Sequence, residues 1–233
     1  RRRSWPGAAS SRRGRYEQVN AYGPRWADLF EEALPGTEVS RFGHGPLNEA
    51  AGLRADREGP LVWLPGRRGT GIAGPSDLEA FAGQVTSLAA EVPVLLKPHP
   101  LAARHGRSAA VLRRLAAARN VTVAPPAESP YRLLEGCRGV LAPAGSLALE
   151  ASCAGLPVAL ARPAGTRLEG LQAELAARAP AFAPGDRGLA EWAQAPPPPT
   201  DTAWARDLLF APDPRRNDAF AARLRERAAG GRA

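Results

Sequence analysis

Short apolar runs alternate with stretches of helical periodicity from about residue 60 onward. Each run has the length of a strand, and the last is apolar throughout, as expected for a strand covered on both faces. Alternation of this kind predicts a parallel, doubly wound α/β sheet of the Rossmann type, in which loops at the carboxyl ends of the strands form the site. The predicted strands are residues 60–65, 92–97, 120–124, 140–142 and 156–160.

Two predicted helices have recognisable starts. Ser76 with Glu79 three residues later is the capping-box pattern. Ser129 is predicted to cap a short helix that has Pro130 at its first position. The buried face of the helix after Ser76 is predicted to consist of Leu78, Phe81, Ala82, Val85, Leu88 and Ala89.

The two ends of the chain differ from this regular region. Residues 16–21 predict a short strand, 24–34 a helix closed by proline and glycine, and 37–42 another strand. Past Pro163 the pattern becomes helical, and we expect the C-terminal helices to pack back across the sheet. These helices are predicted at residues 166–179, 204–210 and 217–229.

The stretch LAPAGSLALEASCAGLP, residues 141–157, predicts a buried strand, a small-residue turn and a helix. Gly145 and Ser146 leave backbone amides uncovered where that helix begins, and the helix dipole favours an anion there. Glu150 lies one turn further along the face that carries Ser146, where a carboxylate can accept both hydroxyls of a ribose. An ordinary strand–turn–helix connection, with Ser146 as a cap and Glu150 solvated, fits the same pattern.

The loop after residues 92–97 carries a second group of candidates. Lys97 is the only lysine in the chain, and His99 lies between two prolines that restrict its backbone. A histidine held at the end of a strand can donate to a diphosphate oxygen or transfer a proton near neutral pH. A lone loop histidine is also compatible with a purely structural role.

Arginines follow the strand at 60–65. Arg67 and Arg68 come just after the end of this strand, just as Lys97 and His99 lie at the end of the strand at 92–97. A guanidinium there can contact phosphate in bidentate fashion. A pair of solvated arginines in an arginine-rich chain is the alternative, above all for Arg67. His44, between glycines after an earlier strand, is a weaker candidate of the same kind.

The charge of the chain is concentrated at one end. The net charge is +8 and the pI about 10.8, yet much of the excess lies in a basic arm at residues 1–14. Such an arm can bind nucleic acid, contact anionic lipid or remain flexible. Because arginine is abundant throughout, we expect no specific nucleic-acid partner.

Composition indicates the size of the core and the cellular compartment. The 233 residues, 44% of them hydrophobic, are enough for a substantial core. No membrane-spanning run or signal peptide is recognised, so we expect a cytoplasmic protein, with peripheral contact at the inner face of the membrane as an option. The chain contains no methionine, so we expect it to be a piece of a longer protein. Cys137 and Cys153 are predicted to be small buried thiols.

Several kinds of site lack their motif. The chain has no GxxxxGK[ST] loop and no HExxH, and GRRGTGIAG lacks the dinucleotide spacing. The acidic pair that commonly holds a divalent metal beside a nucleotide diphosphate is not found either. We therefore predict no cofactor or metal, and expect backbone amides, Arg68, Lys97 and His99 to offset the charge of a diphosphate.

An ordered set of segments resembles a known family. WLPGRR, LLKPHP, SPYRLLEGCRGVLAPAGSLALEASCAGLPVAL and FAPDPRRNDAFAARL resemble the C-terminal, donor-binding half of the CDP-glycerol glycerophosphotransferases, the teichoic-acid polymerase family with the GT-B fold. The resemblance covers about residues 37–229. It implies a nucleotide-binding domain with a C-terminal helical segment at 37–233 and a remnant of, or connection to, a missing acceptor domain at 15–36. The composition predicts a flexible basic arm at 1–14.

The resemblance also implies roles for single residues. Arg68 matches the arginine of a Pro-Thr-aromatic-Arg motif, His99 the histidine of a His-Pro motif, and Ser146 the second serine of an Asp-Tyr-Ser-Ser motif. This chain has Pro143-Ala-Gly where the family has Asp-Tyr-Ser. PAGSLALEA is closer to the equivalent stretch of lipid-A-disaccharide synthases and capsule-polysaccharide transferases, which use nucleotide sugars.

Three functions are therefore open. The first is transfer of a glycerol or polyol phosphate from a CDP-linked donor to a cell-envelope polymer or lipid-linked acceptor, with His99 catalytic. Arg68, Lys97, Gly145 and Ser146 would bind the diphosphate and Glu150 the ribose. The second is a nucleotide-sugar glycosyltransferase or epimerase on the same fold. The third is a non-catalytic or nucleic-acid-binding protein that uses the basic arm.

Overall fold

The computed structural model describes most of the predicted sheet and its helices. The basic arm at 1–14, His44, the Arg67–Arg68 pair and the capping residue Ser76 lie outside the described residues. The described residues are 18–21, 23–41, 49, 52–65, 77–99, 106–125, 127–162, 171–198, 202–209, 215, 221–222 and 225–226.

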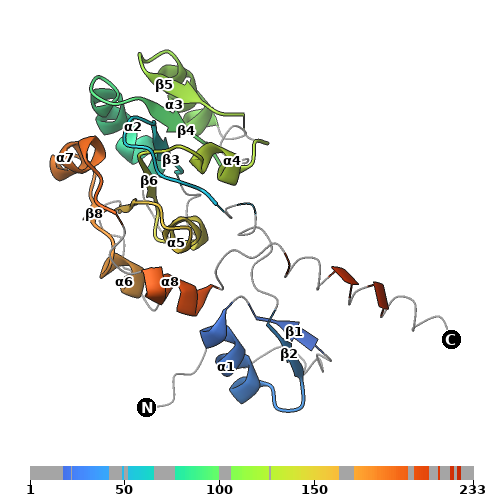
Figure 1. Cartoon of the computed structure of the whole chain (residues 1–233). Helices are drawn as coiled ribbons and strands as arrows, with labels where there is room; N and C mark the ends of the chain where they lie inside the picture. The colour runs from blue at the N-terminus through green and yellow to red at the C-terminus, as the bar shows by residue number, and fades with distance from the viewer. Residues whose placement is uncertain are drawn as a thin grey trace.

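A six-stranded, fully parallel sheet forms the larger part of the protein, which confirms the predicted doubly wound α/β class (Figure 1). Its strand order is β5-β4-β3-β6-β7-β8. The strands are β3 (Leu61–Trp63), β4 (Val94–Leu96), β5 (Val121–Val123), β6 (Gly139–Ala142), β7 (Val158–Ala161) and β8 (Ala181–Phe182).

The strand order places a switch point at the centre of this sheet. After β3 the chain adds β4 and β5 on one side, and it then returns to add β6, β7 and β8 on the other. Trp63 is level with Leu96 of β4 and with Leu141 of β6, so these three strands end at the same edge. Ligands of open parallel sheets bind in the crevice outside the carboxyl ends at such a point.

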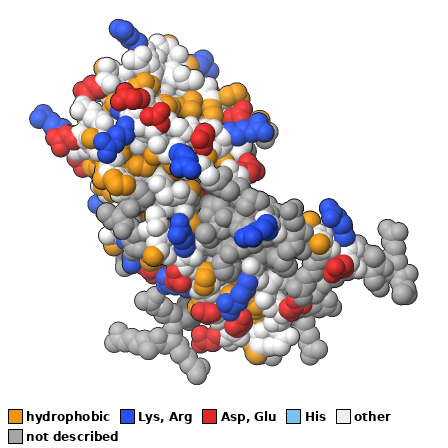
Figure 2. Space-filling model, viewed as in Figure 1, with side chains coloured by type: hydrophobic (Ala, Val, Ile, Leu, Met, Phe, Trp, Pro, Cys, Tyr) orange, Lys and Arg blue, Asp and Glu red, His pale blue; other side chains and the backbone are white. Residues whose placement is uncertain are grey.

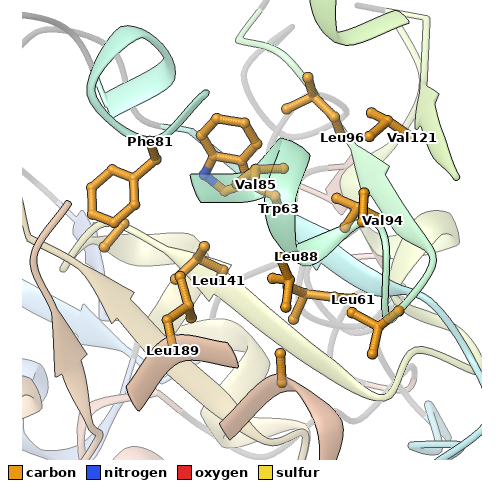
Figure 3. Packing of buried hydrophobic residues seen from close by; sticks show 14 of the residues in the cluster. Leu61, Trp63, Phe81, Val85, Leu88, Val94, Leu96, Val121, Leu141 and Leu189 are labelled. Atoms are coloured by element: carbon orange, nitrogen blue, oxygen red, sulfur yellow. The ribbon is translucent and has the colours of Figure 1, made fainter. Parts of the chain in front are cut away.

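Helices cover both faces of the sheet because successive strand side chains point to opposite sides. On one face Leu61 and Trp63 pack with Phe81 and Val85, under α2 (Asp77–Leu88), α3 (Gly106–Ala116) and α7 (Gly188–Gln194) (Figure 3). All six residues predicted for the buried face of α2 are buried.

The opposite face carries a second core. It includes Val62, Val140 and Leu160 from the strands, together with side chains of the remaining helices. Neither Cys137 nor Cys153 forms a disulfide, and both are buried in this core, as predicted. The helices on this face are α4 (Pro130–Leu134), α5 (Ser146–Cys153), α6 (Leu171–Ala176) and α8 (Thr202–Leu208).

A small unit precedes the sheet. Strands β1 (Gln18–Asn20) and β2 (Glu38–Ser40) pair in parallel, and helix α1 (Pro24–Ala33) lies between them in the sequence. These are the strand, helix and strand predicted from the pattern. Because β2 pairs with β1, β2 belongs to the small sheet, and the larger sheet begins with β3. The larger domain was expected from residue 37 onward. Helix α8 packs between α5 and α1, so a C-terminal helix does return to the main body.

Some local predictions are wrong. The hydroxyl of Ser129 does not cap α4, and donates instead to Glu49 Oε2 at 2.9 Å. Neither β8 nor α7 was predicted. For the last predicted helix the structure describes only residues 221–222 and 225–226, which are helical.

Candidate functional site

An open pocket of about 530 Å³ lies at the carboxyl edge of the sheet. Its walls come from the segments that follow β3, β4, β5 and β6, the four strands around the switch point. Parallel strands bring these loops together because all their carboxyl ends lie at one edge. The lining residues are Leu64, Pro65, Lys97, Pro98, His99, Ala127, Glu128, Ser129, Pro130, Pro143, Gly145, Ser146 and Leu147.

Helix α5 begins at one wall of this pocket. Gly145 is its N-cap and Ser146 its first residue, both exposed, and no acidic side chain lies in the first turn. Gly145 has an extended backbone that any residue can adopt, and a Cβ there would meet only Pro143 O, at 3.9 Å. The local geometry therefore does not require a glycine here. The first-turn N–H groups, together with the helix dipole, favour an anion.

The residues after β4 supply positive charge on another wall. The Lys97 amide continues the sheet by donating to Trp63 O at 3.0 Å, which places its side chain at the strand end. This side chain is only 7% exposed, and its Nζ donates to Pro98 O at 3.2 Å. Burial lowers the Lys97 pKa, and Glu128 partly opposes that effect. A bound anion would favour the charged form further.

Four of the predicted site residues therefore share one pocket. Lys97 and His99 come from the loop after β4, and Gly145 and Ser146 from the start of α5. Arg67 and Arg68 are not described, although Leu64 and Pro65, which precede them, line the same pocket.

Glu150 lies deeper than the pattern suggested. Only 3% of the residue is exposed, and its Oε2 accepts a 2.6 Å hydrogen bond from the Tyr131 hydroxyl on α4. Burial, and then this contact with Glu150, raise the pKa of Tyr131. The alternative of a solvated Glu150 and a capping Ser146 is thus wrong, because Glu150 is buried and no side chain caps α5.

Glu150 lines a second pocket, of about 320 Å³, which meets the first at Gly145 and Ser146. Helices α1, α5, α6 and α8 enclose it. This pocket was not predicted, because its walls come from segments as distant in the chain as Trp26 and Leu209. Tyr131 was also missed; the only local signal was its place just after Pro130 at the start of α4.

Two other kinds of site are absent from the described part of the chain. No group of three or more His, Cys, Asp or Glu side chains is placed to hold a metal ion. No helix there combines the length and apolar character that a membrane span requires.

Two solved structures share this fold. Both are of the wall teichoic acid polymerase TagF, one of them a variant soaked with CDPG. The first matches with a TM-score of 0.62 at 13% identity and the second with 0.57 at 11%. Each match covers 94% of this chain and 59% of the polymerase chain, so this chain spans less than two thirds of its neighbours' length. No protein-family model and no curated protein matches the sequence.

The structural match confirms the expected Rossmann-like domain of GT-B type. At 13% identity, the match shows the fold alone.

Proposed function

We propose that the chain is the donor-binding part of a GT-B transferase that moves a glycerol or polyol phosphate from a CDP-linked donor to a cell-envelope polymer. The observation that carries the proposal is the convergence of Lys97, His99, Gly145 and Ser146 in one pocket at the switch point of the sheet. A pocket of about 530 Å³ is within the range of small-molecule sites. The fold shared with TagF supports the same proposal.

In this proposal the donor diphosphate lies against the start of α5. The amides after Gly145 and the Ser146 hydroxyl donate to its oxygens, and Lys97 offsets its charge from the β4 side. Arg68, three residues after Pro65 on the β3 side of the pocket, is proposed to add a bidentate contact. Donors fixed before the reaction stabilise charge that develops on the phosphate oxygens, which is the main form of catalysis in phosphoryl transfer.

The chemical step is attack of an acceptor hydroxyl on the β-phosphorus of the donor. A bond forms between the acceptor oxygen and phosphorus, the proton of the acceptor hydroxyl is released to solvent, the bond from phosphorus to the bridging oxygen breaks, and CMP leaves with that oxygen. His99 lies within the same pocket and stabilises the charge on the leaving diphosphate oxygen by donating a hydrogen bond or a proton.

Glu150 was predicted to hold the ribose, but it lines the second pocket and not the one in which we place the diphosphate, so we do not assign the ribose to it. Its Oε2 accepts the hydrogen bond from the Tyr131 hydroxyl. The nucleotide-sugar alternative uses the same pocket with a different donor.

The nucleic-acid alternative depends on the arm at 1–14. On the face that Figure 2 shows, described Lys and Arg side chains are interspersed with Asp and Glu and form no continuous basic surface.

Isothermal titration calorimetry with CDP-glycerol, CDP, CMP and UDP-sugars tests the proposal. We expect CDP-glycerol and CDP to bind more tightly than CMP, because the second phosphate reaches the start of α5. Preferential binding of UDP-sugars would favour the glycosyltransferase alternative, and no binding of any nucleotide would refute both.

A further inference from the structure

The second pocket differs chemically from the first. Its wall consists almost wholly of apolar side-chain surface from two tryptophans and four leucines, with Ser146, Glu150 and Gln172 as its polar residues. Glycerol, a sugar or a ribose placed there would lose hydration of several hydroxyls and find few partners, which costs free energy for each unpaired group. The occupant that this wall fits is a hydrocarbon.

The polar atom of one indole in the wall has a partner outside the pocket lining. The Trp204 indole N–H donates to Glu174 Oε2 at 3.3 Å, and Arg25 holds the same carboxylate at 2.7 and 3.0 Å. The Arg178 guanidinium lies 4.6 Å from the centre of the Trp204 ring. These contacts fix one indole in the wall and hold α1, which carries Trp26, beside it.

The position of the pocket indicates what the hydrocarbon is attached to. Gly145 and Ser146 line both pockets, so a chain in the second pocket brings its head group to the anion-favouring start of α5. In the proposed reaction the acceptor must also reach the start of α5, and the second pocket is the side of it that the donor does not occupy.

We propose that the second pocket binds the hydrocarbon part of a lipid-linked acceptor and directs the polar end of that acceptor, a phosphate ester, toward the start of α5, beside the donor diphosphate. This deepens the proposed function, on which it rests for the identity of the acceptor. The pocket itself is defined by its own residues, so it can be tested separately.

The test is a chain-length series. Ethyl to octyl phosphate, each below its micelle-forming concentration, are titrated into the full chain, with inorganic phosphate and 1-alkanols of the same lengths as references. Each buried methylene should tighten binding about fourfold until the pocket is filled, after which affinity should level off. The alkanols should show the same slope with weaker binding. Affinity that does not change with chain length would overturn the proposal.

A matched pair of variants on α5 assigns the effect to this pocket. Leu149 lines the second pocket and Leu147 the first, and both are partly exposed. Leu149→Asn should flatten the chain-length slope, whereas Leu147→Asn should preserve it. Circular dichroism checks that both fold, and an unchanged slope in Leu149→Asn would place the chain elsewhere. The series on the unmodified protein decides the matter even if a variant fails to fold.

Nucleotide binding separates this inference from the proposed function. Hexanol affinity should be unchanged at saturating CDP-glycerol, and its loss would assign the pocket to the donor. Nucleotide binding without a chain-length slope would leave the transferase proposal intact and overturn this inference. A dependence of affinity on chain length without nucleotide binding would support this inference and refute the transferase proposal.

Discussion

The ion pair between Arg25 and Glu174 joins the small unit to the larger sheet. Two guanidinium nitrogens contact the two carboxylate oxygens at 2.7 and 3.0 Å, and the side chains are 32% and 29% exposed. A second ion pair, Arg41–Glu31 at 3.0 Å, has exposures of 49% and 51% and serves as a control. We predict that the first pair is strongly coupled and the second is not.

The expected size follows from the carboxylate. The hydrogen bond from Arg25 lowers the pKa of Glu174 from 4.5 to about 2. Since one pKa unit is worth 1.36 kcal/mol, this shift sets an upper limit of about 3 kcal/mol. Solvent screens a side chain exposed to this extent, and fully exposed pairs contribute about 0–1 kcal/mol. We therefore expect a coupling energy of about 1.5 kcal/mol for Arg25–Glu174 and below about 0.5 kcal/mol for Arg41–Glu31.

The sign of the pH dependence is fixed by the direction of the shift. A carboxylate whose folded pKa is depressed contributes stability above its unfolded pKa, here 4.5, and loses it as the pH falls through its folded pKa of about 2. The coupling between Arg25 and Glu174 should thus be constant from pH 7 to pH 5 and fall to less than half by pH 3.

Double-mutant cycles with Arg25→Ala and Glu174→Gln, measured by urea unfolding, test this. The same cycle with Arg41→Ala and Glu31→Gln gives the control. Equal coupling energies for the two pairs would show that the bidentate contact adds nothing beyond surface attraction. A coupling that did not change between pH 5 and pH 3 would contradict the assigned pKa.

Three further predictions concern packing and burial. Gly139→Ala should destabilise the fold by about 1–3 kcal/mol in urea unfolding, because its Cβ would come within 2.8 Å of an indole carbon of α7. Gly83→Ala, in open space on α2, should instead stabilise by about 0.5–1 kcal/mol, so the opposite order would contradict the packing. Burial raises the Cys137 pKa to about 12, so a disulfide reagent at pH 8 should label this thiol only on unfolding. Tyr131→Phe should cost about 1–3 kcal/mol by removing the donor to buried Glu150, and an unchanged midpoint would refute that role.

The sheet and the main pocket were predictable because their signals are local. Apolar runs of strand length and the periodic face of α2 can be recognised from residues that are close together in the sequence. Once the strands are parallel, their carboxyl ends must share an edge, so Lys97, His99 and Ser146 come together without any knowledge of side-chain contacts.

The features that were missed depend on distant contacts. Strand β8 is only Ala181–Phe182, and its identity comes from pairing with β7. Ser129 has the right pattern for a cap, but its hydroxyl contacts Glu49, a residue 80 positions away. The burial of Glu150 likewise depends on Tyr131 of another helix. No local periodicity encodes such pairings.

The central claim is that a nucleotide diphosphate binds between Lys97 and the start of α5. The most direct measurement is calorimetry of CDP-glycerol with the unmodified chain, Lys97→Met and Arg54→Met. Arg54 is exposed and outside the pocket, so its variant removes one positive charge without touching the site. We predict that Lys97→Met weakens binding at least tenfold, about 1.4 kcal/mol, while Arg54→Met leaves it within twofold. Equal weakening by both variants, or no binding by the unmodified chain, would contradict the claim.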